Sequence, residues 1–170
     1  IIEAMSYYNY IARNDFTHGG DGIFIRPMYG ASPIGNYFLE NDASWANNNA
    51  IESWAPGNVY VGNKANYSSY GFWLGGSDYT YLIDNEVLYN GGSSGRGMQN
   101  APEAFGNAGV SVVSNTSTNF MMMGNVIKYN YGPGVAIRNE SNPVPAYHWL
   151  VQNNIISDNM NDPRGYRGYG

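Results

Sequence analysis

The stretch Leu82-Ile83-Asp84-Asn85-Glu86-Val87 is one of six copies of a short motif in which an Asn closes a brief apolar run and an apolar residue follows two positions later. The Asn residues of the six copies are Asn14, Asn41, Asn63, Asn85, Asn125 and Asn154. Successive copies lie 27, 22, 22, 40 and 29 residues apart. A shortest step near 22 residues, with occasional longer steps, is typical of a solenoid that carries loop insertions.

A second motif recurs between these copies and consists of a small residue followed by alternating side chains, which predicts a strand. It occupies residues 22–26, 50–54, 71–75, 109–113 and 134–138. The residues that we expect to face inward are Ile23, Ile25, Ile51, Ser53, Phe72, Leu74, Val110, Val112, Val135 and Ile137. Those that we expect to face outward are Phe24, Glu52, Trp73, Ser111 and Ala136 at the third position, and Arg26, Trp54, Gly75, Val113 and Arg138 at the fifth.

The two motifs together predict a coil in which each strand pairs with its equivalent one rung above and below, about 4.8 Å away. An inward Asn at each corner then stacks on the next Asn, and its amide bonds to both neighbours and to the turn backbone. Asn also tolerates the left-handed backbone that such corners need. The alternative is that Asn is merely abundant and its register arises by chance. Six copies in one register, each followed by a turn-rich stretch, favour an all-β solenoid of about six rungs.

Composition argues against several other classes of protein. The chain has 170 residues, the size of one structural unit, and its 15% aromatic content is too high for disorder. A net charge of −5, with Lys64 and Lys128 as the only lysines, argues against a nucleic-acid groove. No apolar run approaches the roughly 18 residues that span a bilayer. The absence of cysteine excludes a disulfide framework and thiol catalysis.

We interpret residues 1–170 as a single solenoid segment with loop excursions at 91–108 and 139–147. Residues 1–10 already have the pattern of a rung, and residues 165–170 resemble the start of a further copy of the second motif. We therefore expect the segment to lack end caps. Uncapped terminal rungs would expose apolar core and unpaired strand edges. The segment is then either an interior piece of a longer chain or a unit that stacks on copies of itself.

The Asn-terminated rungs and the Gly-led alternating motif resemble the right-handed parallel β-helix repeat proteins, and the resemblance covers essentially all 170 residues. That family includes carbohydrate-binding and sugar-hydrolase type domains of polysaccharide lyases, uronan epimerases, pectin-type hydrolases and phage tailspikes. The resemblance implies a right-handed, single-stranded parallel β-helix. The resemblance is a weaker guide to activity, because the repeated residues are those that stack the rungs, whereas catalytic and binding residues lie on the outward face.

Stacked rungs place Glu52 between Phe24 and Trp73 and diagonal to Arg26, with Trp54 alongside. Aromatic rings beside a carboxylate and a guanidinium suit a saccharide, since sugar C–H faces pack on rings and Arg pairs with a uronate carboxylate. We therefore predict that Trp54, Trp73, Phe24 and Tyr70 bind substrate. The alternative is that loops cover these rings and that Glu52–Arg26 is an ordinary cross-strand pair.

The predicted catalytic residues are Glu52, His18, Asp21 and Arg26. A His beside a carboxylate can abstract the C5 proton of a sugar, and Arg26 can stabilise the charge that develops. The alternative for His18 is a hydrogen-bonded turn residue. A hydrolase needs two carboxylates on one face, for which Asp21–Glu52 and Asp42–Glu52 are candidates without a diagnostic spacing.

Specific family motifs do not carry over to this chain. Alginate epimerases have an Asp-Pro-His-Asp motif, whereas Asp162-Pro163 is followed here by Arg164-Gly165. The Lys/Arg pair of chondroitinase-like lyases also fails, because Lys64 and Lys128 follow the Asn column, away from the aromatic residues. We predict no cofactor and no metal ligands; calcium is an alternative that no motif indicates.

These observations predict a secreted or surface protein that binds an acidic polysaccharide. If it is an enzyme, the predicted activity is that of a polysaccharide lyase or a C5-epimerase. Its location would be extracellular or on a cell or virion surface, and its partners a polysaccharide and further rungs or copies of the chain, with no nucleic acid and no membrane span. The alternative is a non-catalytic structural or adhesive solenoid, such as a surface-layer, fibre or tailspike component.

Overall fold

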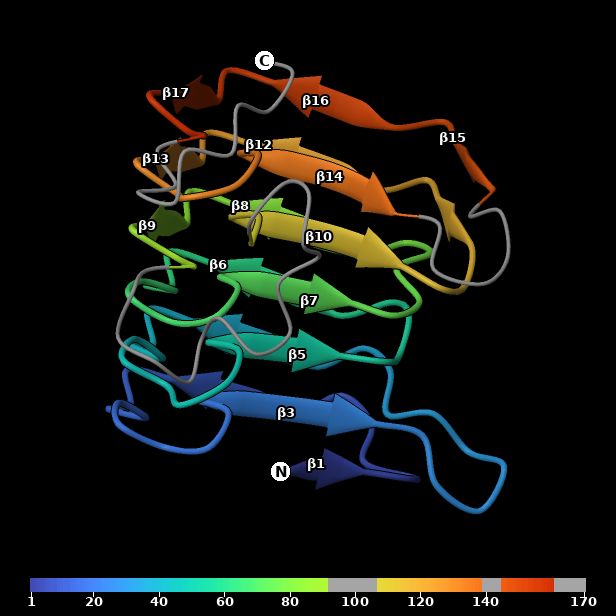
Figure 1. Cartoon of the computed structure of the whole chain (residues 1–170). Helices are drawn as coiled ribbons and strands as arrows, with labels where there is room; N and C mark the ends of the chain where they lie inside the picture. The colour runs from blue at the N-terminus through green and yellow to red at the C-terminus, as the bar shows by residue number, and fades with distance from the viewer. Residues whose placement is uncertain (92–106, 139–144, 161–170) are drawn as a thin grey trace.

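The computed structural model describes residues 1–91, 107–138 and 145–160, and it is a solenoid of parallel strands (Figure 1). Every strand pair in the described residues is parallel, and each strand pairs with its equivalents in the rungs before and after it. The predicted fold class is confirmed: the chain forms a right-handed parallel β-helix.

Three stacked sheets and a short strand pair make up the described solenoid. Sheet A consists of β1 (Ile2–Glu3), β3 (Ile23–Arg26), β5 (Ile51–Ser53), β7 (Phe72–Leu74), β10 (Val110–Val113) and β14 (Val135–Arg138). Sheet B consists of β2 (Tyr10–Ala12), β4 (Tyr37–Leu39), β6 (Val59–Val61), β8 (Tyr81–Ile83), β12 (Met121–Met123) and β16 (Leu150–Gln152). Sheet C consists of β9 (Glu86–Leu88), β13 (Val126–Lys128) and β17 (Ile155–Ser157), and the strand pair consists of β11 (Ser117–Thr118) and β15 (Ala146–Tyr147).

The six predicted Asn residues form one hydrogen-bonded column at the end of sheet B. In its middle, Asn63 Oδ1 accepts from the backbone N–H and from Nδ2 of Asn41, both at 3.0 Å. Asn63 Nδ2 donates to the carbonyl of Phe38 (2.8 Å) and to Oδ1 of Asn85 (3.0 Å). The same bonds continue upward through Asn125 to the last described rung. The column therefore joins each described rung to the next, and its four middle amides, those of Asn41, Asn63, Asn85 and Asn125, are buried.

Each rung turns three corners that are five residues apart, and the residue at each corner has a positive φ. The corner residues are Tyr8, Arg13 and His18; Gly35, Glu40 and Trp45; Gly57, Gly62 and Tyr67; Tyr79, Asp84 and Tyr89; Asn119, Gly124 and Tyr129; and His148, Asn153 and Asp158. A left-handed residue bends the chain within a single position, so the residue that follows it points inward. At the middle corner that inward residue is the Asn of the column. The left-handed residue is therefore the one before the Asn, and not the Asn as predicted.

Two shorter Asn columns stand at the flanking corners, and the sequence analysis missed them. One contains Asn9, Asn36 and Asn58, with Nδ2-to-Oδ1 distances of 2.9 and 3.1 Å. The other contains Asn90, Asn130 and Asn159, with distances of 2.9 Å. These residues lie five positions before or after an Asn of the main column, which is the signal that reveals them.

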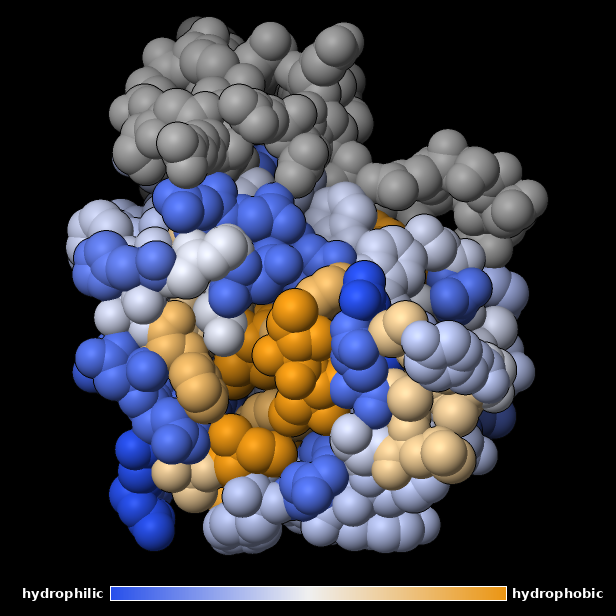
Figure 2. Space-filling view, turned by 90° about the horizontal axis from the view of Figure 1, so that it is seen from below, coloured by the Kyte–Doolittle hydropathy of each residue, from blue (hydrophilic) through white to orange (hydrophobic). Residues whose placement is uncertain are grey.

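The interior is filled by side chains of the three sheets, and the predicted inward positions of sheet A from Ile23 to Val112 are buried. Each large inward side chain contributes about 1.5–3 kcal/mol of burial free energy. In the last strand of sheet A, Ile137 is 50% exposed. At the opposite end, apolar side chains gather in the middle of the end face (Figure 2), where Ile1, Ile2, Ile11 and Phe38 line a small hollow.

Two expectations about individual segments are wrong. Ser111 and Val113 were expected to face solvent, but both are fully buried because β10 is covered on both of its faces. Burial of β10 therefore interrupts the outward column after Trp73, and Ala136 of β14 is again half-buried. Residues 139–147 were expected to be a loop, yet Ala146–Tyr147 is a strand that pairs with Ser117–Thr118. Residues 92–106 and 139–144 of the two predicted excursions lie outside the described residues.

Stacked rings form a second kind of column along the corner that follows sheet C. The rings belong to His18, Trp45, Tyr67, Tyr89 and Tyr129, and neighbouring planes are within 18° of parallel. Trp45 and Tyr67 lie closest, with centroids 4.2 Å apart. Each such pair contributes about 0.5–1.5 kcal/mol beyond burial. These rings cover one another's faces, so the column stabilises the stacking of rungs.

Replacing Asn63 with Ala is expected to destabilise the protein by about 3 kcal/mol, because the buried N–H groups of Asn41 and the carbonyl of Phe38 lose their partners. The measurement is the free energy of unfolding in urea. Asn47→Ala is the matched control, since Asn47 is exposed. Equal loss of stability in both variants would show that the amide column does not hold the rungs together.

Candidate functional site

Glu52 occupies the middle of the outward face of sheet A, as the sequence predicts. On β5 it is level with Phe24 of β3 and with Trp73 of β7. All three side chains are half-buried. A carboxylate between two aromatic rings therefore lies on a surface that a ligand can reach.

Both carboxylate oxygens of Glu52 accept short hydrogen bonds. Trp54 Nε1 donates to Oε1 and Asn49 Nδ2 donates to Oε2, each at 2.6 Å. The Trp54 ring lies over Gly75, where a Cβ atom would collide with the indole. The absence of a side chain at Gly75 therefore makes room for the ring, and the bond to Glu52 fixes its orientation.

The pKa of Glu52 is raised above its ordinary value of 4.5. Burial is the largest cause, and the negative charge of Asp21 adds to it, whereas the hydrogen bonds from Trp54 and Asn49 act in the opposite direction. Because the folded-state pKa is above the unfolded value, this group stabilises the fold most at low pH. That contribution is lost as the pH rises through the raised pKa.

Asp21 reaches the same site through two Asn residues that the sequence analysis did not single out. Asn48 Nδ2 donates to Asp21 Oδ1 at 2.9 Å and lies 3.5 Å from Glu52 Oε2. The backbone N–H of Asn49 donates to the same oxygen of Asp21 at 3.0 Å. Asn49 Oδ1 is buried and has no hydrogen-bond partner. The Asn pair preceding β5 therefore connects carboxylates from two adjacent rungs.

Arg26 and His18, the other two predicted catalytic residues, have their closest contacts elsewhere. Arg26 Nε donates to Glu3 Oε1 at 2.6 Å, and the guanidinium lies 5.5 Å from the centroid of the Phe24 ring. His18 stacks on Trp45. Within the described ranges, no hydrogen bond or ion pair joins either side chain to Glu52. Register nevertheless keeps Arg26 diagonal to Glu52, because Ile25 is level with Ser53.

The prediction that Tyr70 binds substrate directly needs correction. Tyr70 is fully buried, and its ring packs edge-on against Trp73 with centroids 4.6 Å apart. A buried ring offers no face to a ligand, so Tyr70 supports the position of Trp73. Phe24, Trp54 and Trp73 remain as the half-exposed rings of the predicted surface.

The arrangement offers a carboxyl group that keeps its proton to a higher pH than an ordinary Glu, a second carboxylate one rung away, and aromatic rings around them. Such a pair can donate and accept protons at a bound ligand. Among the residues that the structure describes, no group of three His, Cys, Asp or Glu side chains is placed to hold a metal ion. The same described residues contain no helix that is long and apolar enough to cross a membrane.

A family model described as the right handed beta helix region matches residues 2–170, nearly the whole chain. No curated protein matches the chain.

Two substitutions are expected to move the pKa of Glu52 in opposite directions. Trp54→Phe removes a hydrogen bond to the carboxylate and raises the pKa, whereas Asp21→Asn removes a nearby negative charge and lowers it. Titration of the Glu52 carboxyl carbon by NMR measures both shifts. Asp84→Asn, an exposed carboxylate on another corner, is the control and leaves the midpoint unchanged. Shifts of the same sign in the two variants would contradict the account of this site.

Proposed function

This chain belongs to the right-handed β-helix family, and from that premise we propose that it binds an acidic polysaccharide on the outward face of sheet A. The observation that carries the proposal is the half-buried carboxyl group of Glu52, level with Phe24 and Trp73 and bonded to the indole of Trp54. Rings pack on the C–H faces of sugars, and polar groups between the rings bond to hydroxyls.

Arg26 provides the preference for an acidic polymer. Its side chain is 44% exposed and is paired with Glu3, so a uronate carboxylate can compete for the guanidinium at the edge of the aromatic surface. Guanidinium groups bind carboxylates with two parallel hydrogen bonds. We place the uronate carboxylate at Arg26 and the sugar ring between Phe24, Trp54 and Trp73.

The chemistry that we propose is removal of the C5 proton of the bound uronate. The Asp21 carboxylate accepts this proton while Arg26 stabilises the charge on the uronate carboxylate. In a lyase the bond from C4 to the glycosidic oxygen then breaks, a C4–C5 double bond forms, and protonated Glu52 donates its proton to the leaving oxygen. In an epimerase the C4–O bond stays intact, and protonated Glu52 donates its proton to C5 from the opposite face of the sugar. The proposed location, where such polymers occur, is extracellular or on a cell or virion surface.

A panel of uronic-acid polymers tests the proposal, with absorbance of the 4,5-unsaturated product and NMR of C5 inversion as the activity readouts and calorimetry as the binding readout. Glu52→Gln is expected to lower lyase turnover by about 10²–10⁴-fold. Trp54→Ala is expected to weaken binding by about tenfold.

Asp84→Asn is the control for both readouts. Absence of binding and of turnover across the panel would overturn the proposal and would favour the non-catalytic structural solenoid. Binding without turnover, unchanged in Glu52→Gln and in Trp54→Ala, would place the polymer on another face.

A further inference from the structure

The hydrogen-bond partners of the Glu52 carboxyl group among the described residues are all donors. Trp54 Nε1 donates to Oε1 and Asn49 Nδ2 donates to Oε2, each at 2.6 Å, and Asn48 Nδ2 lies 3.5 Å from Oε2. Such partners suit a carboxylate, whose oxygens only accept, but a proton on one oxygen turns that oxygen into a donor. The acid form of Glu52 therefore needs a neighbour that can accept a hydrogen bond.

Asn49 is the neighbour that can become an acceptor without losing any other hydrogen bond of its side chain. The indole N–H of Trp54 is a donor only. Nδ2 of Asn48 also donates to Asp21 Oδ1 at 2.9 Å, so turning that amide would place its oxygen against a carboxylate. Asn49 is 3% exposed, and its Oδ1 is buried without a hydrogen-bond partner. Turning the Asn49 amide therefore breaks only the bond to Glu52.

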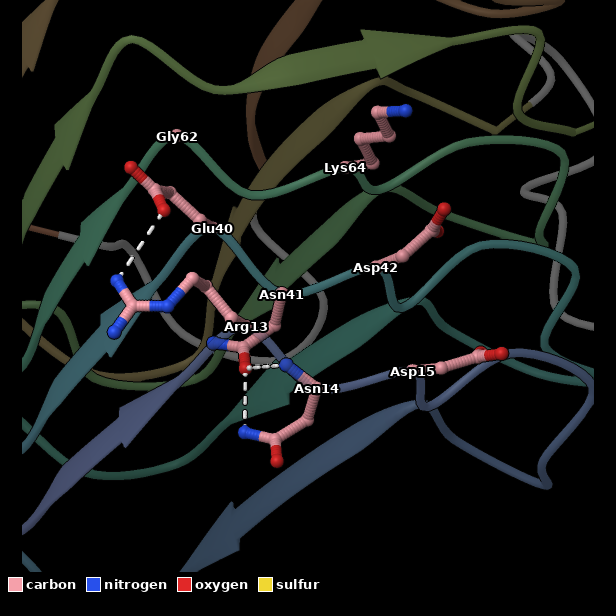
Figure 3. Close-up of a pocket in the computed structure, with 8 residues that line it drawn as sticks. All are labelled: Arg13, Asn14, Asp15, Glu40, Asn41, Asp42, Gly62 and Lys64. Carbon is pink, nitrogen blue, oxygen red and sulfur yellow. Dashed lines mark hydrogen bonds and ion pairs between the residues drawn. The ribbon is translucent and has the colours of Figure 1, made fainter.

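The buried amides of the main Asn column do not have this freedom. Figure 3 shows one of them, Asn41, which lines an open groove at the corner after sheet B. Its Oδ1 accepts from the backbone N–H and from Nδ2 of Asn14, at 3.0 and 2.9 Å. Its Nδ2 donates to the carbonyl of Ile11 and to Oδ1 of Asn63. Turning this amide would bring donors against donors and oxygens against oxygens, so its orientation is fixed.

We propose that Asn49 is a positioning residue for Glu52 and that its side-chain amide turns over when Glu52 gains or loses a proton. In the carboxylate form, Nδ2 donates to Oε2, as in the structure. In the acid form, the amide has made half a turn about its Cβ–Cγ bond, and Oδ1 accepts from the protonated Oε2. The buried oxygen that lacks a partner in the first form is bonded in the second.

This rotation gives a hydrogen-bond partner to both forms of a proton donor. It rests on the proposed function, in which protonated Glu52 gives its proton to the bound uronate. Before the transfer, Oδ1 of Asn49 orients the O–H group. After the transfer, Nδ2 stabilises the new carboxylate with a charge-assisted hydrogen bond. Asn49 thus acts through Glu52 and exchanges no proton itself.

The charged groups around Glu52 set the pH at which the amide turns. In the described residues these are Asp21, in the turn before β3, and Arg26, at the end of β3 and paired with Glu3; β7, on the other side, brings Trp73 and no charged side chain. Burial and the negative charge of Asp21 raise the pKa of Glu52. The amide therefore turns at a higher pH than that at which an exposed Glu is protonated.

Scalar coupling across the hydrogen bond, measured by NMR on the ligand-free protein, tests the inference. Above the midpoint of the Glu52 titration, coupling joins Nδ2 of Asn49 to the carboxyl carbon of Glu52, and it is expected to disappear as Glu52 is protonated. In Glu52→Gln, the introduced amide keeps its oxygen on the indole N–H of Trp54 and presents its NH₂ group to Asn49. Coupling is then expected in the reverse direction at neutral pH, from the introduced nitrogen to Cγ of Asn49.

The control is the coupling from Nδ2 of Asn63 to the carbonyl carbon of Phe38, which persists at every pH because neither group titrates. Coupling from Nδ2 of Asn49 to the side chain at position 52 that survives below the midpoint, or in Glu52→Gln, would overturn the inference. Absence of the reverse coupling in Glu52→Gln would overturn it as well.

Turnover separates this inference from the proposed function. Asn49→Leu keeps the backbone N–H that donates to Asp21. It is expected to lower kcat of the proposed lyase about tenfold at unchanged KM, as for the loss of a hydrogen bond to a charged group. Unchanged kcat would overturn the positioning role. The expected couplings without turnover in the unmodified protein would support the rotation and contradict the proposed function.

Discussion

The structure depends on one polar constraint: burying a side-chain amide without its hydrogen-bond partners costs free energy, so the amides of the main Asn column favour the arrangement in which their bonds are made. At the corner after sheet B, each interior amide satisfies this only when the Asn of the neighbouring rung lies directly above or below it. A rung that slipped by one residue would bury unpaired amides and would turn its apolar side chains outward. The amide column therefore fixes the register of all three sheets as well as holding the rungs together.

Fixed register is what turns a repeat into functional surfaces. Side chains that are far apart in the chain become neighbours in vertical columns, so Phe24, Glu52 and Trp73 meet although they lie in three different rungs. The left-handed corners have a second consequence, because the residues on either side of each inward Asn project outward and leave a groove between them. The outward residues vary between rungs while the inward ones stay similar. The residues available for binding or catalysis are therefore different from those that stabilise the fold.

Sequence periodicity is sufficient to predict the fold, the main Asn column and the position of Glu52, because all three follow from strand alternation and from a repeated inward residue. It is not sufficient to predict how long side chains orient. Arg26 lies in the predicted register, yet its guanidinium pairs with Glu3 of the preceding rung. The five-residue spacing of the corners was also hidden, because residues as different as Arg13, Gly62 and Tyr89 adopt the left-handed conformation. Burial of Tyr70 depends on contacts that no local pattern records.

Hydrogen exchange of Asn side-chain amides, followed by NMR, tests the central claim most directly. If the column is continuous, the Nδ2 protons of Asn63 and Asn85 exchange orders of magnitude more slowly than those of exposed Asn47, because exchange requires the rungs to separate. Exchange of the column amides at the rate of Asn47 would contradict the account, since the amides would then be open to water and could not set the register.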